Sequence, residues 1–150
     1  QELVAEGFVR FIDRIADEEI DFRLGVVTTD TDEANPDRGR LVGDPAWLTR
    51  DEDYLPLMMS RVQVGIDGSD KEQGLEAAWL ALDEEINPGF LRDEGSALVV
   101  FFMTDEPDQT PTTIEGQDGG QYLLNKIATA KSGCGFYFFD IFRILVKRRI

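Results

Sequence analysis

Hydrophobic residues recur at two different periods along this chain, and the two periods predict different elements. Spacings of three and four residues predict an amphipathic helix over 1–19 and another that starts after the turn-rich loop 65–70 and ends at 87–89. Residues 22–28 are typical of a strand. Seven consecutive apolar residues over 97–103 predict a parallel strand buried on both faces. Shorter elements are expected as strands over 40–42 and 136–142 and as helices within 47–62 and over 121–132.

Strands and helices therefore alternate along the chain. This order predicts an α/β fold with three layers, in which helices flank a mostly parallel, Rossmann-like sheet with right-handed crossovers. The sequence shows no internal repeat and no low-complexity segment. We therefore expect a single domain over 1–150.

Composition then limits the chemistry. The 150 residues include no histidine and one cysteine, which excludes catalytic triads with histidine, histidine-ligated metals and an internal disulfide. The net charge of −15 argues against a nucleic-acid partner. The most apolar stretch is too short to span a bilayer. The chemistry that the composition still allows is the binding of hard cations such as Mg²⁺, Ca²⁺ or Mn²⁺ by oxygen ligands.

The charge is distributed unevenly. Residues 1–120 carry a net charge of −20, whereas 121–150 carry +5. The acidic part contains both carboxylate groups that follow predicted strands, and ligands of open α/β sheets bind at such strand ends. The ordinary alternative is that these acids only end each strand in a solvated loop. The groups are Asp30 and Asp32 after the first strand, and Asp105, Glu106 and Asp108 after the apolar strand.

Ser69 also has two interpretations. Together with Glu72 it matches the S-x-x-E sequence motif of a capping box, in which the serine hydroxyl caps the following helix. The alternative uses the same hydroxyl as a neutral oxygen ligand for a cation.

Three segments together resemble von Willebrand factor type A domains, in particular bacterial exported members. Residues 22–30, FRLGVVTTD, resemble the second strand of the family. Residues 68–78, GSDKEQGLEAA, are similar to its middle loop and helix, and residues 99–105, VVFFMTD, to its apolar strand ending in Thr/Ser-Asp. The order and spacing agree over 1–108, and 109–150 match more loosely.

The resemblance implies a non-enzymatic, adhesion-type module that binds an acidic group of a protein partner through a divalent cation. It places Ser69 and Asp105 among the metal ligands, with Asp30, Glu106 and Asp108 on the rim. The D-x-S-x-S motif of the family does not occur in these 150 residues. We therefore expect the remaining ligands and the first strand upstream of Gln1. The resemblance also implies an extracellular or cell-surface location, although the chain shows no signal peptide.

Two other functions remain open. One is a metal-assisted phosphatase or hydrolase that uses Asp105 as nucleophile or ligand. Haloacid-dehalogenase-like phosphatases have a D-x-D motif, however, and the run Asp105-Glu106-Pro107-Asp108 has a different spacing. The other is a structural or assembly domain that binds no metal.

Overall fold

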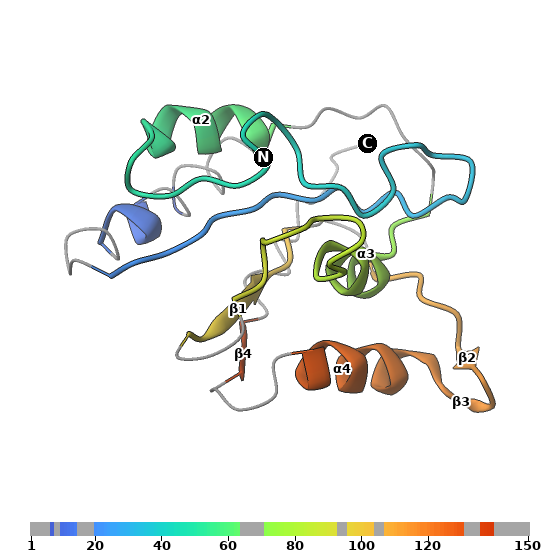
Figure 1. The fold of residues 1–150 in the computed structure, drawn as a ribbon. Coiled ribbons are helices and arrows are strands. Elements are labelled where there is room, and N and C mark those ends of the chain that lie inside the picture. The colour runs from blue at the N-terminus through green and yellow to red at the C-terminus, as the bar shows by residue number, and fades with distance from the viewer. Residues whose placement is uncertain are drawn as a thin grey trace, which may run out of the picture.

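The computed structural model contains both helices and strands, which confirms the prediction of a mixed α/β chain. It describes residues 7, 10–14, 20–63, 71–92, 96–103, 107–130 and 136–139, and residues 10–14 are helical. The other elements, in chain order, are α2 (Tyr54–Arg61), α3 (Gly74–Ala81), β1 (Leu98–Phe101), β2 (Thr113–Ile114), β3 (Gln117–Asp118), α4 (Gly119–Ala130) and β4 (Phe136–Phe139) (Figure 1).

Strands β1 and β4 pair in parallel, with α4 in the connection between them. The register places Leu98 opposite Phe136 and Phe101 opposite Phe139. The parallel orientation is as predicted, but the prediction that this strand is buried on both faces is wrong, because Val99 is 39% exposed. Among the described strands, β4 is the one hydrogen-bonded neighbour of β1, so the pair does not extend into a larger sheet.

Residues 22–28 are extended but form one isolated bridge instead of the predicted strand. Leu24 and Leu48 exchange two antiparallel hydrogen bonds of 2.8 Å, and the N–H of Val42 donates to the carbonyl of Val26 at 2.8 Å. The described strands thus form two separate pairs, β1 with β4 and β2 with β3.

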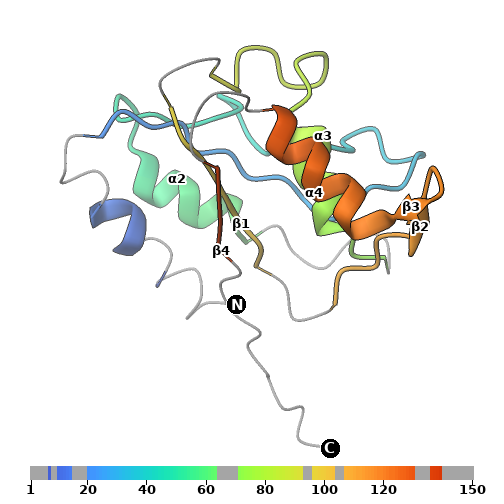
Figure 2. The ribbon, with the colours of Figure 1, turned by 90° about the horizontal axis from the view of Figure 1, so that it is seen from below.

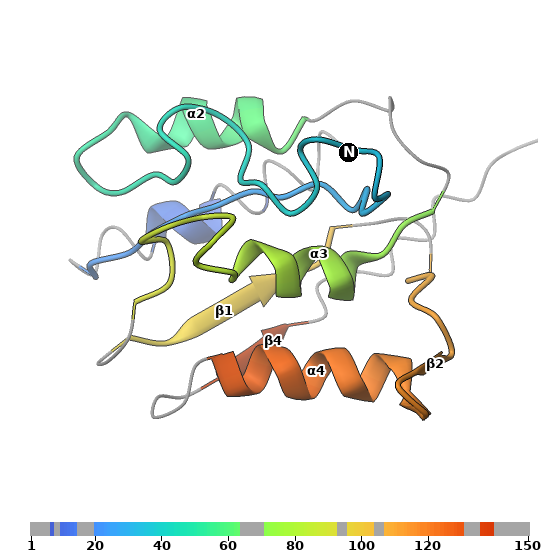
Figure 3. The same ribbon diagram turned by 45° about the vertical axis from the view of Figure 1, so that its right-hand side comes forward.

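Helices α3 and α4 pack side by side and hold the core between them (Figures 2 and 3). Ala78 and Leu82 contact Ile127, which is 0% exposed. Burying a side chain of this size stabilises the fold by about 1.5–3 kcal/mol. Helix α2 lies on the opposite side of the molecule from α4 (Figures 1 and 3). No helix in the described ranges is long and apolar enough to cross a bilayer.

The segment before α4 is a short hairpin, in which β2 pairs with β3 in antiparallel orientation. Glu115 and Gly116 have φ of 50° and 77°, the left-handed pair that a tight two-residue turn requires. The hairpin ends at Asp118, whose Oδ1 accepts a hydrogen bond of 2.8 Å from the N–H of Gln121. The last residue of β3 therefore caps the first turn of α4.

The buried side-chain amide of Asn87 fixes the chain around the end of α3. Its Nδ2 donates to the carbonyls of Gly39 (2.8 Å) and Ala81 (3.1 Å), and its Oδ1 accepts from the N–H of Leu41 (3.0 Å). Gly39 has a φ of +71°, and a Cβ there would lie 2.5 Å from that of Leu80. Helix α3 ends at Ala81, earlier than predicted. The Asn87 side chain donates a hydrogen bond to the carbonyl of Ala81, the last residue of the helix.

Replacing Asn87 by Ala should lower the free energy of unfolding by about 2–3 kcal/mol. The substitution leaves an N–H and two carbonyls without their partner in a buried place. Urea denaturation monitored by circular dichroism measures the effect. The matched control is Asn125→Ala on the exposed face of α4, which should change the stability by less than about 0.5 kcal/mol. Equal effects of the two substitutions would contradict the role of Asn87.

Candidate functional site

Three segments far apart in the sequence meet at the N-terminus of α3. They are the end of the extended segment at 29–31, residues 72–75 at the start of α3, and residues 108–109 after β1. We call this meeting point the junction. It consists of three hydrogen bonds: the Gln73 N–H to the Thr29 carbonyl (3.1 Å), the Gln109 N–H to the Glu72 carbonyl (2.7 Å), and the Leu75 N–H to Asp108 Oδ2 (2.9 Å).

Asp108 lies at the junction, where it caps α3 from a different part of the chain. Its Oδ2 accepts from the N–H of Leu75, and its Oδ1 accepts from the N–H of Thr110 at 2.9 Å. A carboxylate at this place satisfies a free N–H of the first turn and interacts favourably with the helix dipole. Both oxygens of this predicted rim residue are thus engaged by the backbone.

The predicted capping box is wrong. Helix α3 begins at Gly74, its N-cap residue is Gln73, and the Gln73 side chain makes no capping bond. Ser69 lies five positions before Gly74 in the sequence, so it is not the N-cap residue of α3.

Asp30 shapes the turn that follows the extended segment. Its Oδ1 accepts from the N–H of Asp32 at 3.1 Å, and its carbonyl accepts from Nδ2 of Asn35 at 3.3 Å. Asp32 in turn accepts a bond of 2.8 Å from the N–H of Ala34. These carboxylates therefore also bind backbone groups, as the solvated-loop interpretation expects.

A polar network lines the surface next to the junction. The hydroxyl of Thr31, which is 5% exposed, donates to Oε1 of Gln73 (3.0 Å), and Nε2 of Gln73 donates to Glu76 (3.1 Å). Glu76 also pairs with Arg38 at 2.5 Å. The cavity here measures about 340 Å³. Its lining residues are Thr31, Asp32, Glu33, Arg38, Lys71, Gln73 and Glu76.

Of the residues that line this cavity, the sequence pattern singled out only Asp32. One sequence feature could have pointed to Gln73 and Glu76: both lie at the start of a predicted helix, where polar side chains often bind backbone or side chains of neighbouring loops. No sequence feature points to Arg38, because its partner Glu76 lies 38 residues away in the chain.

Three predicted residues, Ser69, Asp105 and Glu106, lie outside the described residues, so their placement as metal ligands or rim stays a prediction. Within the described ranges, no group of three or more Asp, Glu or Cys side chains has the arrangement of a metal site. A serine hydroxyl and an aspartate carboxylate are suitable donors for Mg²⁺ or Ca²⁺. The donor chemistry of this pair fits a hard cation, whereas Asp108 already binds two N–H groups.

No protein-family model, curated protein or solved structure matches this chain.

Replacing Asp108 by Ala should lower the free energy of unfolding by about 1 kcal/mol, because α3 then loses its cap. Chemical denaturation measures the change. Asp53→Ala is the matched control, since Asp53 is the N-cap residue of α2 and its side chain makes no capping bond. If both variants unfold at the same denaturant concentration, Asp108 does not stabilise α3.

Proposed function

We propose that this protein is a non-enzymatic interaction module that binds a protein partner through a divalent cation near the junction. One observation supports the proposal above the others: two of the three segments that carry the resemblance, 22–30 and 68–78, meet at the junction with Asp108 and Gln109, which follow the third segment in the chain. Thr29 precedes Asp30, and Glu72 and Asp108 each lie three residues after a proposed ligand, Ser69 and Asp105 respectively.

In this proposal the fold is a three-layer α/β domain of the von Willebrand factor A type. The parallel pair β1–β4 with α4 in its connection supports this arrangement, as does the extended segment 22–28 that ends at the junction. The protein would function at the cell surface or outside the cell, as the resemblance implies.

Ser69 and Asp105 would hold the cation, which would be Mg²⁺, Ca²⁺ or Mn²⁺. The cation supplies a positive charge with a coordination position for an acidic group of the partner. The chain itself fixes the surroundings: the Asp108 cap holds the N-terminus of α3, and the bond between Gln73 and Thr29 holds the loop beside it.

Calorimetry with Mn²⁺ and Mg²⁺ tests the proposal on the 150-residue chain. We expect saturable but weak binding, since Ser69 and Asp105 supply only two ligands and a divalent cation takes six or more. Asp105→Ala should weaken binding at least about tenfold, the loss of a charged ligand being worth more than 1.4 kcal/mol. The control Asp53→Ala should bind as the unchanged protein does.

Other outcomes would contradict the proposal. If the chain binds no divalent cation, the protein is a metal-free structural or assembly domain. That outcome would agree with the backbone bonds of Asp30 and Asp108. Turnover of a phosphate ester that Asp105→Ala abolishes would instead show the phosphatase.

A further inference from the structure

Two arginines line a cavity away from the junction, in a protein of net charge −15. Arg92 lies six residues before β1, whereas the junction uses the residues that follow this strand. The cavity measures about 670 Å³, within the range of small-molecule sites. We call it the arginine cavity, and its lining residues are Arg23, Leu82, Glu84, Gly89, Leu91 and Arg92.

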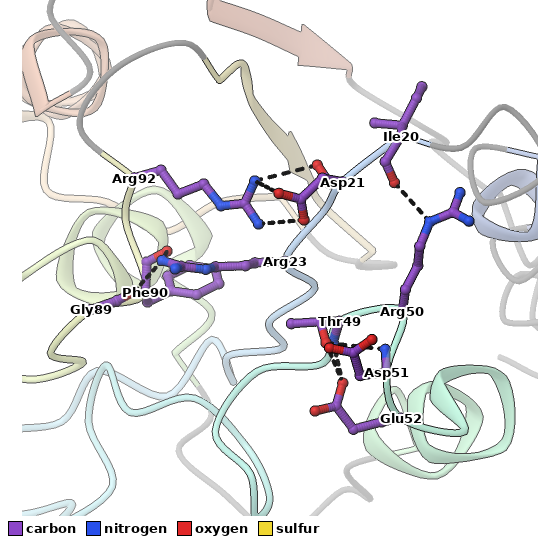
Figure 4. Close-up of polar contacts among 10 residues, drawn as sticks. All are labelled: Ile20, Asp21, Arg23, Thr49, Arg50, Asp51, Glu52, Gly89, Phe90 and Arg92. Carbon is purple, nitrogen blue, oxygen red and sulfur yellow. Dashed lines mark hydrogen bonds and ion pairs between the residues drawn. The ribbon is translucent and has the colours of Figure 1, made fainter.

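Arg92 already binds a carboxylate in a forked, two-point geometry (Figure 4). Its Nη1 donates to Oδ2 of Asp21 at 2.8 Å, and its Nη2 donates to Oδ1 at 2.7 Å. The Asp21 side chain is 80% exposed, and the Arg92 side chain is 26% exposed. An ion pair so open to water contributes little to stability. Another carboxylate can therefore replace that of Asp21 at small cost.

Arg23 is held at the cavity by the backbone of the loop before β1. Its Nη1 donates to the carbonyls of Gly89 and Phe90, the latter at 3.1 Å (Figure 4). Its guanidinium carbon lies 5.5 Å from the centre of the Trp47 ring. A guanidinium has five N–H donors, and these contacts use only those of Nη1. The positioned cation thus keeps donors for a further acceptor.

The charges around Asp21 favour an anion. The hydrogen bond from Arg92 holds the pKa of the Asp21 carboxyl below its usual range, and the positive charges of Arg92, Arg23 and Arg50 act in the same direction. The acidic residue of the lining, Glu84, uses its Oε1 to accept from the N–H of Gly89 at 2.8 Å.

We propose that the arginine cavity binds a small amphipathic carboxylate. Its carboxylate replaces that of Asp21 on Arg92, within reach of Arg23, and its aliphatic part lies against Leu82 and Leu91. The forked pair with Asp21 identifies the headgroup, because a planar guanidinium matches the two oxygens of a carboxylate. Leu82 and Leu91 are the apolar side chains of the lining that an alkyl chain would contact.

Titration with hexanoate, followed by calorimetry and by NMR of the backbone amides, tests this proposal on the 150-residue chain. We expect saturable binding, with shifts at Arg23, Gly89 and Arg92. Asp21→Asn removes the competing carboxylate and should tighten binding severalfold. Arg92→Gln should weaken it about two- to fivefold, which is the value of one exposed ion pair.

Arg40→Gln is the matched control, because it removes the same charge at an exposed position whose Nε binds the carbonyl of Pro36. It should bind hexanoate as the unchanged protein does. Circular dichroism verifies the fold of each variant. If Arg92→Gln unfolds the protein, Arg92→Lys replaces it: the charge stays, the fork is lost, and binding should weaken severalfold.

Three results would overturn the proposal. One is the absence of saturable binding to both the unchanged protein and Asp21→Asn. The second is equal affinity of the Arg92 variant and the Arg40 control. The third is binding of 1-hexanol as tight as that of hexanoate, since an alcohol lacks the charge that the guanidinium recognises.

Discussion

The fold depends most on the position of α3, and hydrogen bonds from distant segments fix that helix at both ends. At its C-terminus, Asn87 joins the last carbonyl of the helix to Gly39 and Leu41. At its N-terminus, Asp108 caps the first turn. An eight-residue helix is too short to be stable alone. Its position is therefore fixed by its contacts with α4 and by the hydrogen bonds of Asn87 and Asp108 at its two ends.

Arginines form the other cross-links of the loop-rich part. Arg23, Arg50 and Arg61 all donate to main-chain carbonyls that are more than ten residues away. Arg61 is only 6% exposed, and its Nη2 lies 2.6 Å from the carbonyl of Pro45. A guanidinium suits this role because it offers several donors in one plane. In a chain with twice as many acids as bases, these arginines bind backbone as well as carboxylates.

The elements that sequence analysis predicted well have a strong local pattern. Strands were predicted over 97–103 and 136–142 and a helix over 121–132; β1 and β4 lie within the first two ranges, and α4 overlaps the third. The pattern did not predict the hairpin at 113–118, because Glu115 is an unusual residue for a left-handed turn position. It also did not predict where α3 begins and ends, since Asp108 and Asn87 determine both from outside the helix. Of the candidate site, sequence order identified the segments that meet, but not the hydrogen bonds of Asp30 and Asp108.

The junction and the arginine cavity use residues on either side of β1 in the chain: Asp108 follows the strand, and Arg92 precedes it. Helix α3 connects the two places, because it receives its cap from Asp108 at one end and contributes Leu82, its C-cap residue, to the arginine cavity at the other. The net charge of −15 consequently describes neither place, because the arginine cavity has two arginines in its lining and Asp108 at the junction binds backbone N–H groups.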